Sequence, residues 1–341
     1  MHAIDDKMFA AAGVYSDWRL YQGSVDSSCA LQAIGERTLS ELHNSTGRWV
    51  SYQELSDDAK GFVALLHSKC LESNLPFHCV RLTFTTQTKK IVLRIQEMGG
   101  FYACKRVLAK PPSLGDLSLP DPVLNMLRSK QLQDKGGLVI MIGDTGTGKT
   151  TTATATMRDR LKIFGGYGLV LGDPPECPVN DDSDIGNKVG LNGYVNELDV
   201  SAIGYTKGLQ HGLRSFPIGE AGRLLYGEVR SDSNALDLVL ASCNGHELFS
   251  TMHAMTANAA LDRLILLCVR DGASEHLVRS ILAQALFGFV LHRVTRGVFS
   301  ASAHPATEDV KTKIRNGVPL PFTAQFESFQ TLATLRNNKK P

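Results

Sequence analysis

The sequence of 341 residues lacks the long apolar runs that a membrane-spanning helix needs. No run reaches the length of about 18 residues that predicts such a helix. The longest apolar stretch, Ile281 to Leu291, is interrupted by Gln284 and Gly288. The N-terminal residues, MHAIDDKMF, also lack the charged-then-apolar order of a secretory signal. These absences predict a protein that stays in the cytoplasm.

The sequence also has little net charge and no cysteine pairs. Lys and Arg number 36 against 34 Asp and Glu, a formal net charge of +2. A dedicated nucleic-acid binder usually carries a basic domain or stripe, so we expect no direct nucleic-acid partner. The seven cysteines include no C-x-x-C pair. An odd, unpaired set predicts reduced and mostly buried thiols, in preference to a disulfide framework or a zinc site.

What is present is an ordinary globular composition, 43% apolar and 21% charged, at a length that suggests about two domains. Residues 1–104 are typical of a small α+β domain. Ser56 followed by two aspartates predicts a helix start, and the period-two segments 79–84 and 91–95 predict a hairpin. Four prolines between residues 111 and 122 predict a linker, which we place over 105–122.

The remaining residues, 123–341, have the pattern of an α/β domain. We expect apolar strands at 138–142, 169–171 and 224–226, and a helix from about Lys149. Strands that alternate with helices in this way predict a mostly parallel sheet covered on both faces.

Residues 143–150 read Gly-Asp-Thr-Gly-Thr-Gly-Lys-Thr, which fits the P-loop pattern G-x-x-x-x-G-K-[ST]. Glycines let backbone N–H groups close around phosphate oxygens, and the following helix directs its positive end at the same anion. Lys149 supplies a point charge for the β- and γ-phosphates, and Thr150 offers a hydroxyl to Mg²⁺. The pattern predicts ATP and Mg²⁺ as cofactors. The expected nucleotide-binding residues are Gly143, Asp144, Thr145, Gly146, Thr147, Gly148, Lys149, Thr150 and Thr151.

Two further strands end in acidic residues. One reads Leu-Leu-Tyr-Gly-Glu and ends at Glu228, and the other runs into Asp173-Pro174-Pro175-Glu176. Carboxylates at such ends can reach a metal or a water, although a surface acid after a strand is also common. Further on, His246 and His253 lie seven residues apart around an apolar strand. That spacing disfavours a shared metal, and the alternative for each histidine is simple packing in the sheet.

Taken in order, the segments GDTGTGKT, GDPPE, YGEVR and NGHELFSTMHA resemble the boxes of the secretion ATPase superfamily of type II and type IV secretion and type IV pili. The resemblance extends from about residue 105 to 295. It implies a RecA-like ATPase domain behind a smaller PAS-like domain, assembled as a homo-hexamer. It also implies a place at the cytoplasmic face of the inner membrane, with a platform protein of that membrane as partner.

The resemblance also implies roles for single residues. Lys149 and Thr150 would hold phosphates and Mg²⁺, with Glu228 and Asp173 as further metal-directed acids. Either Glu176 or Glu228 could remove the proton from water. We favour Glu176 as the general base and Glu228 as the Walker B acid. His253 would sense the γ-phosphate, and His246 would support the site.

In this superfamily, arginines also reach the nucleotide between subunits. Residues 205–214 resemble the helix F-x-x-A-L-R-x-x-L-R, with Arg214 at the second arginine and Gln210 in place of the first. Arg81 and Arg94 of the N-terminal hairpin correspond to arginines that contact a neighbour's nucleotide. For each of the three, a solvated surface charge is the alternative. The chain also has Gly172 where the family usually has glutamate.

The predicted function is therefore a hexameric ATP-hydrolysing motor for a type IV pilus or a type IVB secretion or conjugation machine. The length matches short members of the PilT or the DotB/TraJ type. Gly172 and Gln210 keep open a weakly hydrolysing, nucleotide-binding regulatory paralogue. A small-molecule kinase or a nucleic-acid translocase is disfavoured, because no arginine-rich lid and no basic stripe are evident.

Overall fold

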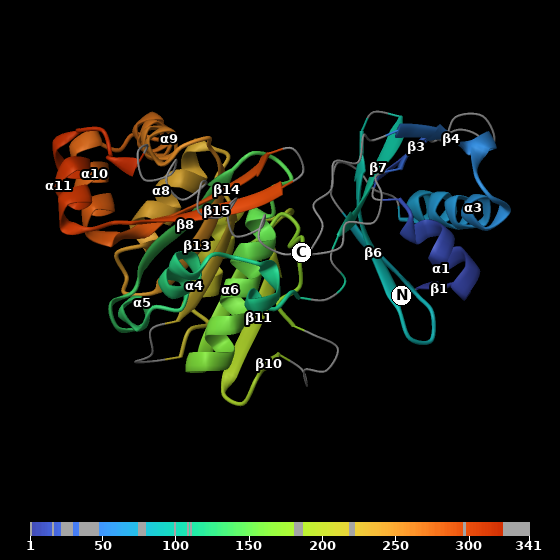
Figure 1. Cartoon of the computed structure of the whole chain (residues 1–341), viewed down its shortest axis with the longest axis horizontal. Helices are drawn as coiled ribbons and strands as arrows, with labels where there is room; N and C mark the ends of the chain where they lie inside the picture. Colours follow the sequence, from blue (N-terminus) through green and yellow to red (C-terminus); the bar gives the residue numbers. More distant parts are fainter. Residues whose placement is uncertain are drawn as a thin grey trace, which may run out of the picture. The chain divides into compact units, whose positions relative to one another are not determined.

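The computed structural model separates into two compact units, Met1–Ala109 and Lys110–Pro341 (Figure 1). The structure describes residues 2–15, 17–21, 30–33, 48–73, 80–98, 100–107, 109, 111–180, 187–217, 222–295 and 298–322.

The first unit is an α+β domain whose sheet has the strand order β1-β5-β6-β7-β2-β3-β4. The strands are β1 (His2–Ala3), β2 (Asp17–Tyr21), β3 (Ala30–Ala33), β4 (Arg48–Ser51), β5 (Val80–Thr85), β6 (Lys90–Glu97) and β7 (Phe101–Val107). Among the described strands of this first sheet, β1 and β5 pair in parallel and the other pairs are antiparallel. Helices α1 (Asp6–Gly13) and α3 (Asp57–Glu72) pack on this sheet's core.

The helix and the hairpin predicted for the first unit are confirmed. Ser56 is the N-cap of α3, where its Oγ accepts a hydrogen bond from the Ala59 N–H at 3.3 Å. Strands β5 and β6 form the hairpin, and Arg81 and Arg94 occupy partner positions across it. The side chain of Arg81 lies outside the described part of the structure.

The second unit is built on a sheet with the strand order β10-β11-β9-β12-β13-β8-β14-β15. The strands are β8 (Gly137–Gly143), β9 (Gly166–Gly172), β10 (Lys188–Val189), β11 (Gly193–Asp199), β12 (Arg223–Glu228), β13 (Glu247–His253), β14 (Leu286–Thr295) and β15 (Val298–Pro305). The six strands from β11 to β14 in this order are parallel, and β10 and β15 are antiparallel edges. The predicted parallel sheet is confirmed.

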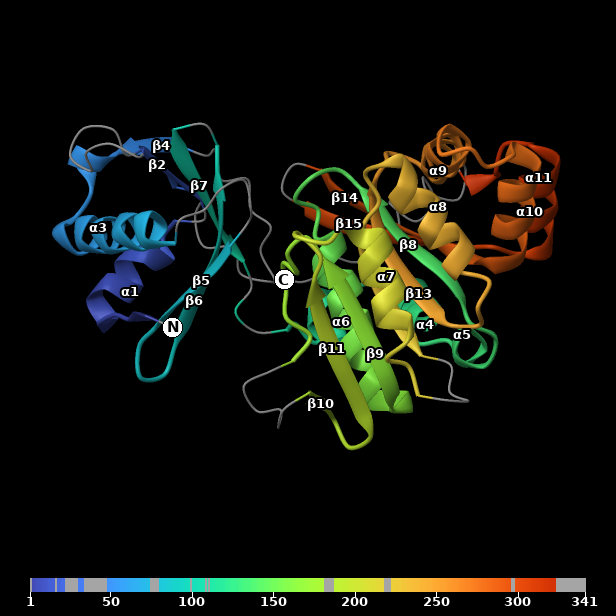
Figure 2. The same ribbon diagram turned by 180° about the vertical axis from the view of Figure 1, so that it is seen from behind.

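Helices cover both faces of this sheet (Figures 1 and 2). They are α4 (Asp121–Leu127), α5 (Lys130–Lys135), α6 (Lys149–Phe164), α7 (Tyr205–Leu213), α8 (Asp232–Ala241), α9 (Ala257–Arg270), α10 (Glu275–Ala285) and α11 (Glu308–Asn316). Strand β8 is buried along its whole length. Val139 and Met141 pack in the core that contains α6, and Ile140 and Ile142 in the core that contains α8 and α9. This two-sided burial explains why β8 is apolar at every position.

The segment between the units differs from the expected linker 105–122. Strand β7 extends to Val107, so the first residues of that range belong to the sheet. Residues 114–117 form a 3-10 helix, and Leu114 and Leu117 are buried in the α6 core of the second unit. Helix α4 begins at Asp121, directly after Pro120. The prolines flank these two short helices. The residues from 110 to 122 therefore belong to the second unit.

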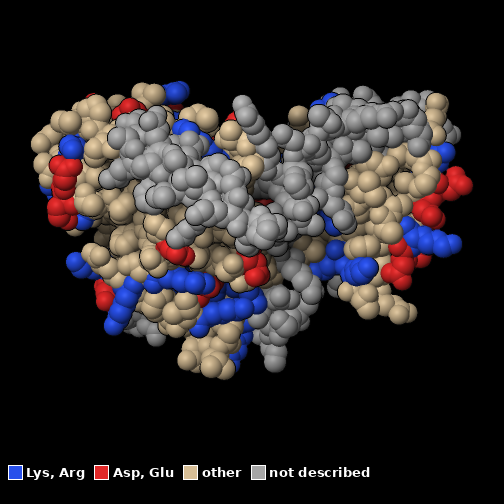
Figure 3. All heavy atoms as spheres, viewed as in Figure 1, with Lys and Arg blue, Asp and Glu red and all other residues tan. Residues whose placement is uncertain are grey.

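The surface carries charges of both signs. On the face drawn in Figure 3, Lys and Arg side chains gather along the lower border of the second unit, and Asp and Glu side chains lie close to them. Within the described residues, no helix combines the length and the apolar character needed to cross a membrane.

A buried ion cluster holds the amino ends of the strands in the second unit. Glu247, the first residue of β13, is 2% exposed and pairs with Arg160 of α6 and Arg223 of β12. Arg160 also donates to the carbonyl oxygen of Leu127 at 2.7 Å. One carboxylate thus balances two buried cations and ties a helix to two strands.

We expect Glu247→Gln to destabilise the second unit by about 3 kcal/mol or more, because two guanidinium groups lose their buried counter-charge. Hydrogen–deuterium exchange of residues 247–253 across a urea series measures this change. Glu308→Gln is the control, because Glu308 pairs with Lys311 on the exposed surface of α11. Equal effects of the two substitutions would contradict a structural role for the cluster.

Candidate active site

Part of each of the four sequence boxes lies at the end of one of four neighbouring parallel strands. The strands β9, β12, β13 and β8 lie side by side in this order and end at Gly172, Glu228, His253 and Gly143. Ligands of open parallel sheets bind at the carboxyl ends of the strands. The sheet therefore brings the P-loop, the acidic turn, Glu228 and His253 to one edge.

The P-loop connects β8 to α6 and has the backbone that its glycines allow. Gly146 and Gly148 have φ values of 75° and 84°, in the left-handed region. A Cβ at Gly143 would lie 2.5 Å from the carbonyl oxygen of His292 on β14. Helix α6 begins at Lys149 without a side-chain cap, so its first N–H groups face the loop. This is the form of an anion-binding helix start.

Lys149 places a buried positive charge inside the loop. It is 6% exposed, and its Nζ donates to the carbonyl oxygens of Gly143 at 3.1 Å and Asp144 at 2.7 Å. Burial lowers the pKa of Lys149 from its ordinary value, and the nearby carboxylate of Glu228 opposes that shift. An ammonium solvated chiefly by carbonyl dipoles favours the arrival of an anion.

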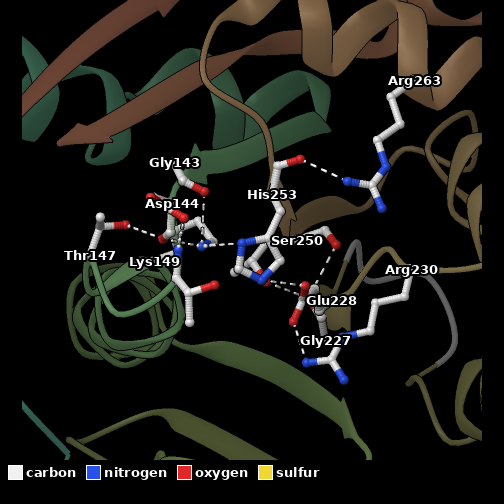
Figure 4. Close-up of polar contacts among 12 residues, drawn as sticks. Gly143, Asp144, Thr147, Lys149, Gly227, Glu228, Arg230, Ser250, His253 and Arg263 are labelled. Atoms are coloured by element: carbon white, nitrogen blue, oxygen red, sulfur yellow. Dashed lines mark hydrogen bonds and ion pairs between the residues drawn. The ribbon is translucent and has the colours of Figure 1, made fainter.

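His253 lies between Lys149 and Glu228 and contacts both (Figure 4). Its Nδ1 is 3.3 Å from Nζ of Lys149, and its Nε2 is 2.9 Å from Oε1 of Glu228. An ammonium can only donate, so Nδ1 accepts, and this assignment places the ring hydrogen on Nε2, facing the carboxylate. Arg263 of α9 donates to the His253 carbonyl oxygen at 2.9 Å. The imidazole therefore links the phosphate-directed cation to the acid.

A bulge at the end of β12 directs Glu228 toward the loop. The register with β13 shifts between Tyr226 and Glu228, and the Ser250 hydroxyl donates to the Tyr226 carbonyl oxygen at 2.6 Å. A Cβ at Gly227 would lie 2.0 Å from the hydroxyl of Tyr205, so a side chain there would have to displace the Tyr205 ring. Burial raises the pKa of Tyr205 to about 12, so this phenol stays neutral. Tyr205 was not among the residues that the sequence pointed to.

Arg230 is a second residue that sequence reasoning left without a role. Its Nη2 donates to Oε2 of Glu228, and this hydrogen bond is the main cause that raises the pKa of Arg230. The charge of Glu176 acts in the same direction. Arg230 thus lies within the electrostatic reach of both candidate acids, and its contact with Glu228 is drawn in Figure 4. The sequence signal that could have pointed to Arg230 is its place in the motif G-E-x-R.

The acidic turn after β9 is rigid and tight. Asp173 is exposed and Glu176 half-buried, and the charge of Glu176 is felt at Lys149. A Cβ at Gly172 would lie 2.5 Å from Cα of Pro175, a backbone atom that cannot swing away. The glycine that replaces the family's usual glutamate is therefore required by the proline three residues later.

The structure places His246 away from the P-loop. Its Nδ1 accepts a hydrogen bond from the Gly222 N–H at 3.0 Å, and its ring stacks on Phe216 with centroids 4.7 Å apart. His246 precedes β13 and His253 ends it. Seven extended residues span about 20 Å, so the two histidines lie at opposite edges of the sheet.

Arg214 also lies at the amino edge of the sheet. It is the C-cap of α7, and the hydroxyl of the next residue, Ser215, is 2.8 Å from that of Tyr167 at the start of β9. The fold therefore does not bring Arg214 to the P-loop of its own chain. Arg81 and Arg94 belong to the first unit.

His292 contacts the P-loop from the side opposite His253. It is completely buried on β14, its register partner is Gly143, and its Nδ1 is 3.2 Å from the carbonyl oxygen of Thr147. Burial lowers the pKa of His292 to about 4. The sequence could reveal this contact only together with the strand order, because 145 residues separate the two positions.

A P-loop beside a Walker-type acid on a parallel sheet defines a nucleoside-triphosphate-binding protein with the RecA-like fold. The family model described as type II/IV secretion system protein matches residues 67–296. The chain therefore belongs to this family.

Two curated relatives are similar to about half of the chain. The chain is 30% identical over 161 residues to the type IV pilus ATPase PilU of Pseudomonas aeruginosa and 31% identical over 175 residues to the competence protein ComGA of Bacillus subtilis. These matches span 47% and 51% of this chain, and only 38% and 45% of the relatives.

Two solved structures share the fold at low sequence identity. The pilus retraction motor PilT with bound ADP has a TM-score of 0.63 at 19% identity, covering 99% of this chain and 90% of that one. The ATPase DotB of Legionella pneumophila has a TM-score of 0.64 at 15% identity, covering 91% and 84%.

The buried histidines predict acid sensitivity of the second unit. Burial lowers the pKa of both His292 and His304 to about 4, against an ordinary 6.5. Their neutral state stabilises the fold fully above pH 6.5, and that stability is lost as pH falls from about 6.5 to 4, because the unfolded chain binds protons first. Each histidine accounts for about 3 kcal/mol over that window.

Urea denaturation between pH 7.5 and 4.5 measures the slope of stability against pH. His304→Gln is expected to flatten it, whereas the same substitution at His211, exposed on α7, leaves it unchanged. An unaltered slope in His304→Gln would contradict this origin.

Proposed function

We propose that the chain is an ATP-hydrolysing motor subunit. The observation that carries the proposal is the contact series from Lys149 through His253 to Glu228 at the mouth of the P-loop. It joins a cation for phosphate, a histidine placed to sense the γ-phosphate and an acid in one connected group.

The site fits ATP and Mg²⁺ by the chemistry of its donors. The uncapped start of α6 and the buried ammonium of Lys149 suit a triphosphate. The hydroxyl of Thr150 and the carboxylates of Glu228 and Asp173 are oxygen ligands of the kind Mg²⁺ prefers. Bound Mg²⁺ would offset the negative charge of the phosphates.

Within the site we assign Glu176 as the general base. Oε2 of Glu228 accepts a hydrogen bond from Nη2 of Arg230, and Oε1 lies 2.9 Å from Nε2 of His253, so Glu228 is placed to orient these two groups. Glu228 then fixes His253 and the metal side of the site, and Glu176 takes the proton from the attacking water.

We further propose that the motor is a homo-hexamer at the cytoplasmic face of a bacterial inner membrane, acting on a platform protein of a type IV pilus or a type IVB secretion or conjugation machine. Arg214 lies about 20 Å from the P-loop edge of its own sheet, so a role at a nucleotide requires a neighbouring subunit. Arg81 and Arg94 would act from the neighbour's first unit. A phosphate held by two subunits makes hydrolysis loosen their interface.

Steady-state ATP hydrolysis, with the mass measured in the same buffer, tests the motor proposal. Lys149→Ala should abolish nucleotide binding. Glu228→Gln should retain binding and lose at least about a hundredfold in turnover. Glu308→Gln on exposed α11 is the matched control and should behave as the native chain.

Two other results would favour other functions. Rings that bind ATP without turnover would support the regulatory paralogue, for which Gln210 in place of an arginine is the motivating observation. A monomer that converts ATP to ADP only when a small acceptor is present, with the phosphoryl group found on that acceptor, would contradict the motor and indicate a kinase.

The tight acidic turn gives a separate prediction. Gly172→Ala should lower turnover between about tenfold and a hundredfold, because the new Cβ displaces Pro175 and with it Glu176. The affinity for nucleotide should stay at the native value, because the P-loop follows β8 and Gly172 lies at the end of β9. Gly115→Ala is the control, where a Cβ meets only ordinary contacts. Gly172→Glu, which restores the family's usual residue, should also lower turnover. A rise would show that the turn tolerates a side chain.

A further inference from the structure

His292 touches the P-loop at two places. Its carbonyl oxygen and Cβ lie 2.5 Å and 3.2 Å from the position that a Cβ on Gly143 would take. Its ring reaches the middle of the loop, where Nδ1 lies 3.2 Å from the Thr147 carbonyl oxygen. Among the described residues around the P-loop, no other side chain forms a hydrogen bond with the Thr147 carbonyl oxygen.

The direction of this hydrogen bond is fixed by its partner. A carbonyl oxygen only accepts, so Nδ1 of His292 carries the hydrogen and donates. Nε2 is then a buried acceptor, and it has no hydrogen-bond partner within the described residues. The His292 ring therefore donates its one N–H to the P-loop. Its Nε2 stays without a hydrogen bond, and this lowers the stability of the fold.

The consequence for the loop follows from the planarity of the peptide. In a trans peptide the C=O and the next N–H point in opposite directions. Holding the Thr147 carbonyl against His292 of β14 therefore turns the Gly148 N–H away from β14. The Gly148 carbonyl is fixed as well, because it accepts the helical hydrogen bond from Thr152 N–H at 2.9 Å. Gly148 keeps a φ of 84° between these two anchors.

We propose that His292 is a positioning residue that presets the phosphate-binding shape of the P-loop through its hydrogen bond to Thr147. The inference rests on the proposed nucleotide site, which it deepens by adding a residue from outside the sequence boxes. His292 does not touch the nucleotide; it orients the backbone donor that does.

Two substitutions separate the hydrogen bond from simple packing. His292→Phe keeps a ring against Phe299, whose centroid is 5.4 Å from that of His292, and removes the donor. His292→Asn carries an N–H the same number of bonds from Cα as Nδ1 and so retains the donor. His304→Phe is the control, a buried histidine of β15 that bonds Ser302 at 2.9 Å.

The first readout needs no nucleotide. Hydrogen–deuterium exchange of residues 143–150 in the apo protein should accelerate at least about tenfold in His292→Phe, and stay near the native rate in His292→Asn and His304→Phe. Equal rates in His292→Phe and the native chain, or equal acceleration in both His292 variants, would overturn the proposal.

The second readout is nucleotide affinity and turnover. His292→Phe should weaken ATP binding and raise KM about tenfold with kcat changed less, and His292→Asn should restore both. A native chain that binds no ATP would overturn the proposed function, and the exchange experiment would still decide the role of His292.

Discussion

The active-site edge depends on one imidazole held between an ammonium and a carboxylate. Strand β13 lies between β8 and β12, so a side chain at its end can span from Lys149, at the start of the helix after β8, to Glu228 at the end of β12. His253 fills that position, and the two partners determine which of its nitrogens carries the hydrogen. A bound phosphate that attracts Lys149 must therefore disturb its hydrogen bond to Nδ1 of His253. The contact between His253 and Glu228 is then disturbed as well.

The electrostatics of the loop make it ready for an anion. Lys149 is nearly as buried as a core residue, and carbonyl dipoles replace its hydration. Burying an ammonium this way costs free energy that an arriving phosphate offsets. Glu228 stabilises this charge without touching it, because His253 lies between them and Arg230 donates to the second carboxylate oxygen. The positive charge of Lys149 is thus left available to attract an anionic ligand.

Local signals predicted most of the fold, and long-range packing decided the parts of the site that they missed. The P-loop, the Ser56 cap and the apolar strands depend on neighbours in sequence, and each was found where expected. His246 and His253 share one sequence box, yet an extended strand separates them to opposite edges. The reason for Gly172 lies in the clash with Pro175, which becomes visible only in the folded turn.

Both strands that flank β8 place a histidine opposite Gly143, His253 on β13 and His292 on β14. Their surroundings give them opposite roles. His253 is 37% exposed and accepts from Lys149 through Nδ1, so a ligand can take its partner away. His292 is completely buried and donates through Nδ1 to a backbone carbonyl, an acceptor that never leaves. Because the same atom accepts in one ring and donates in the other, the first histidine is suited to respond to the nucleotide and the second to hold the loop that binds it.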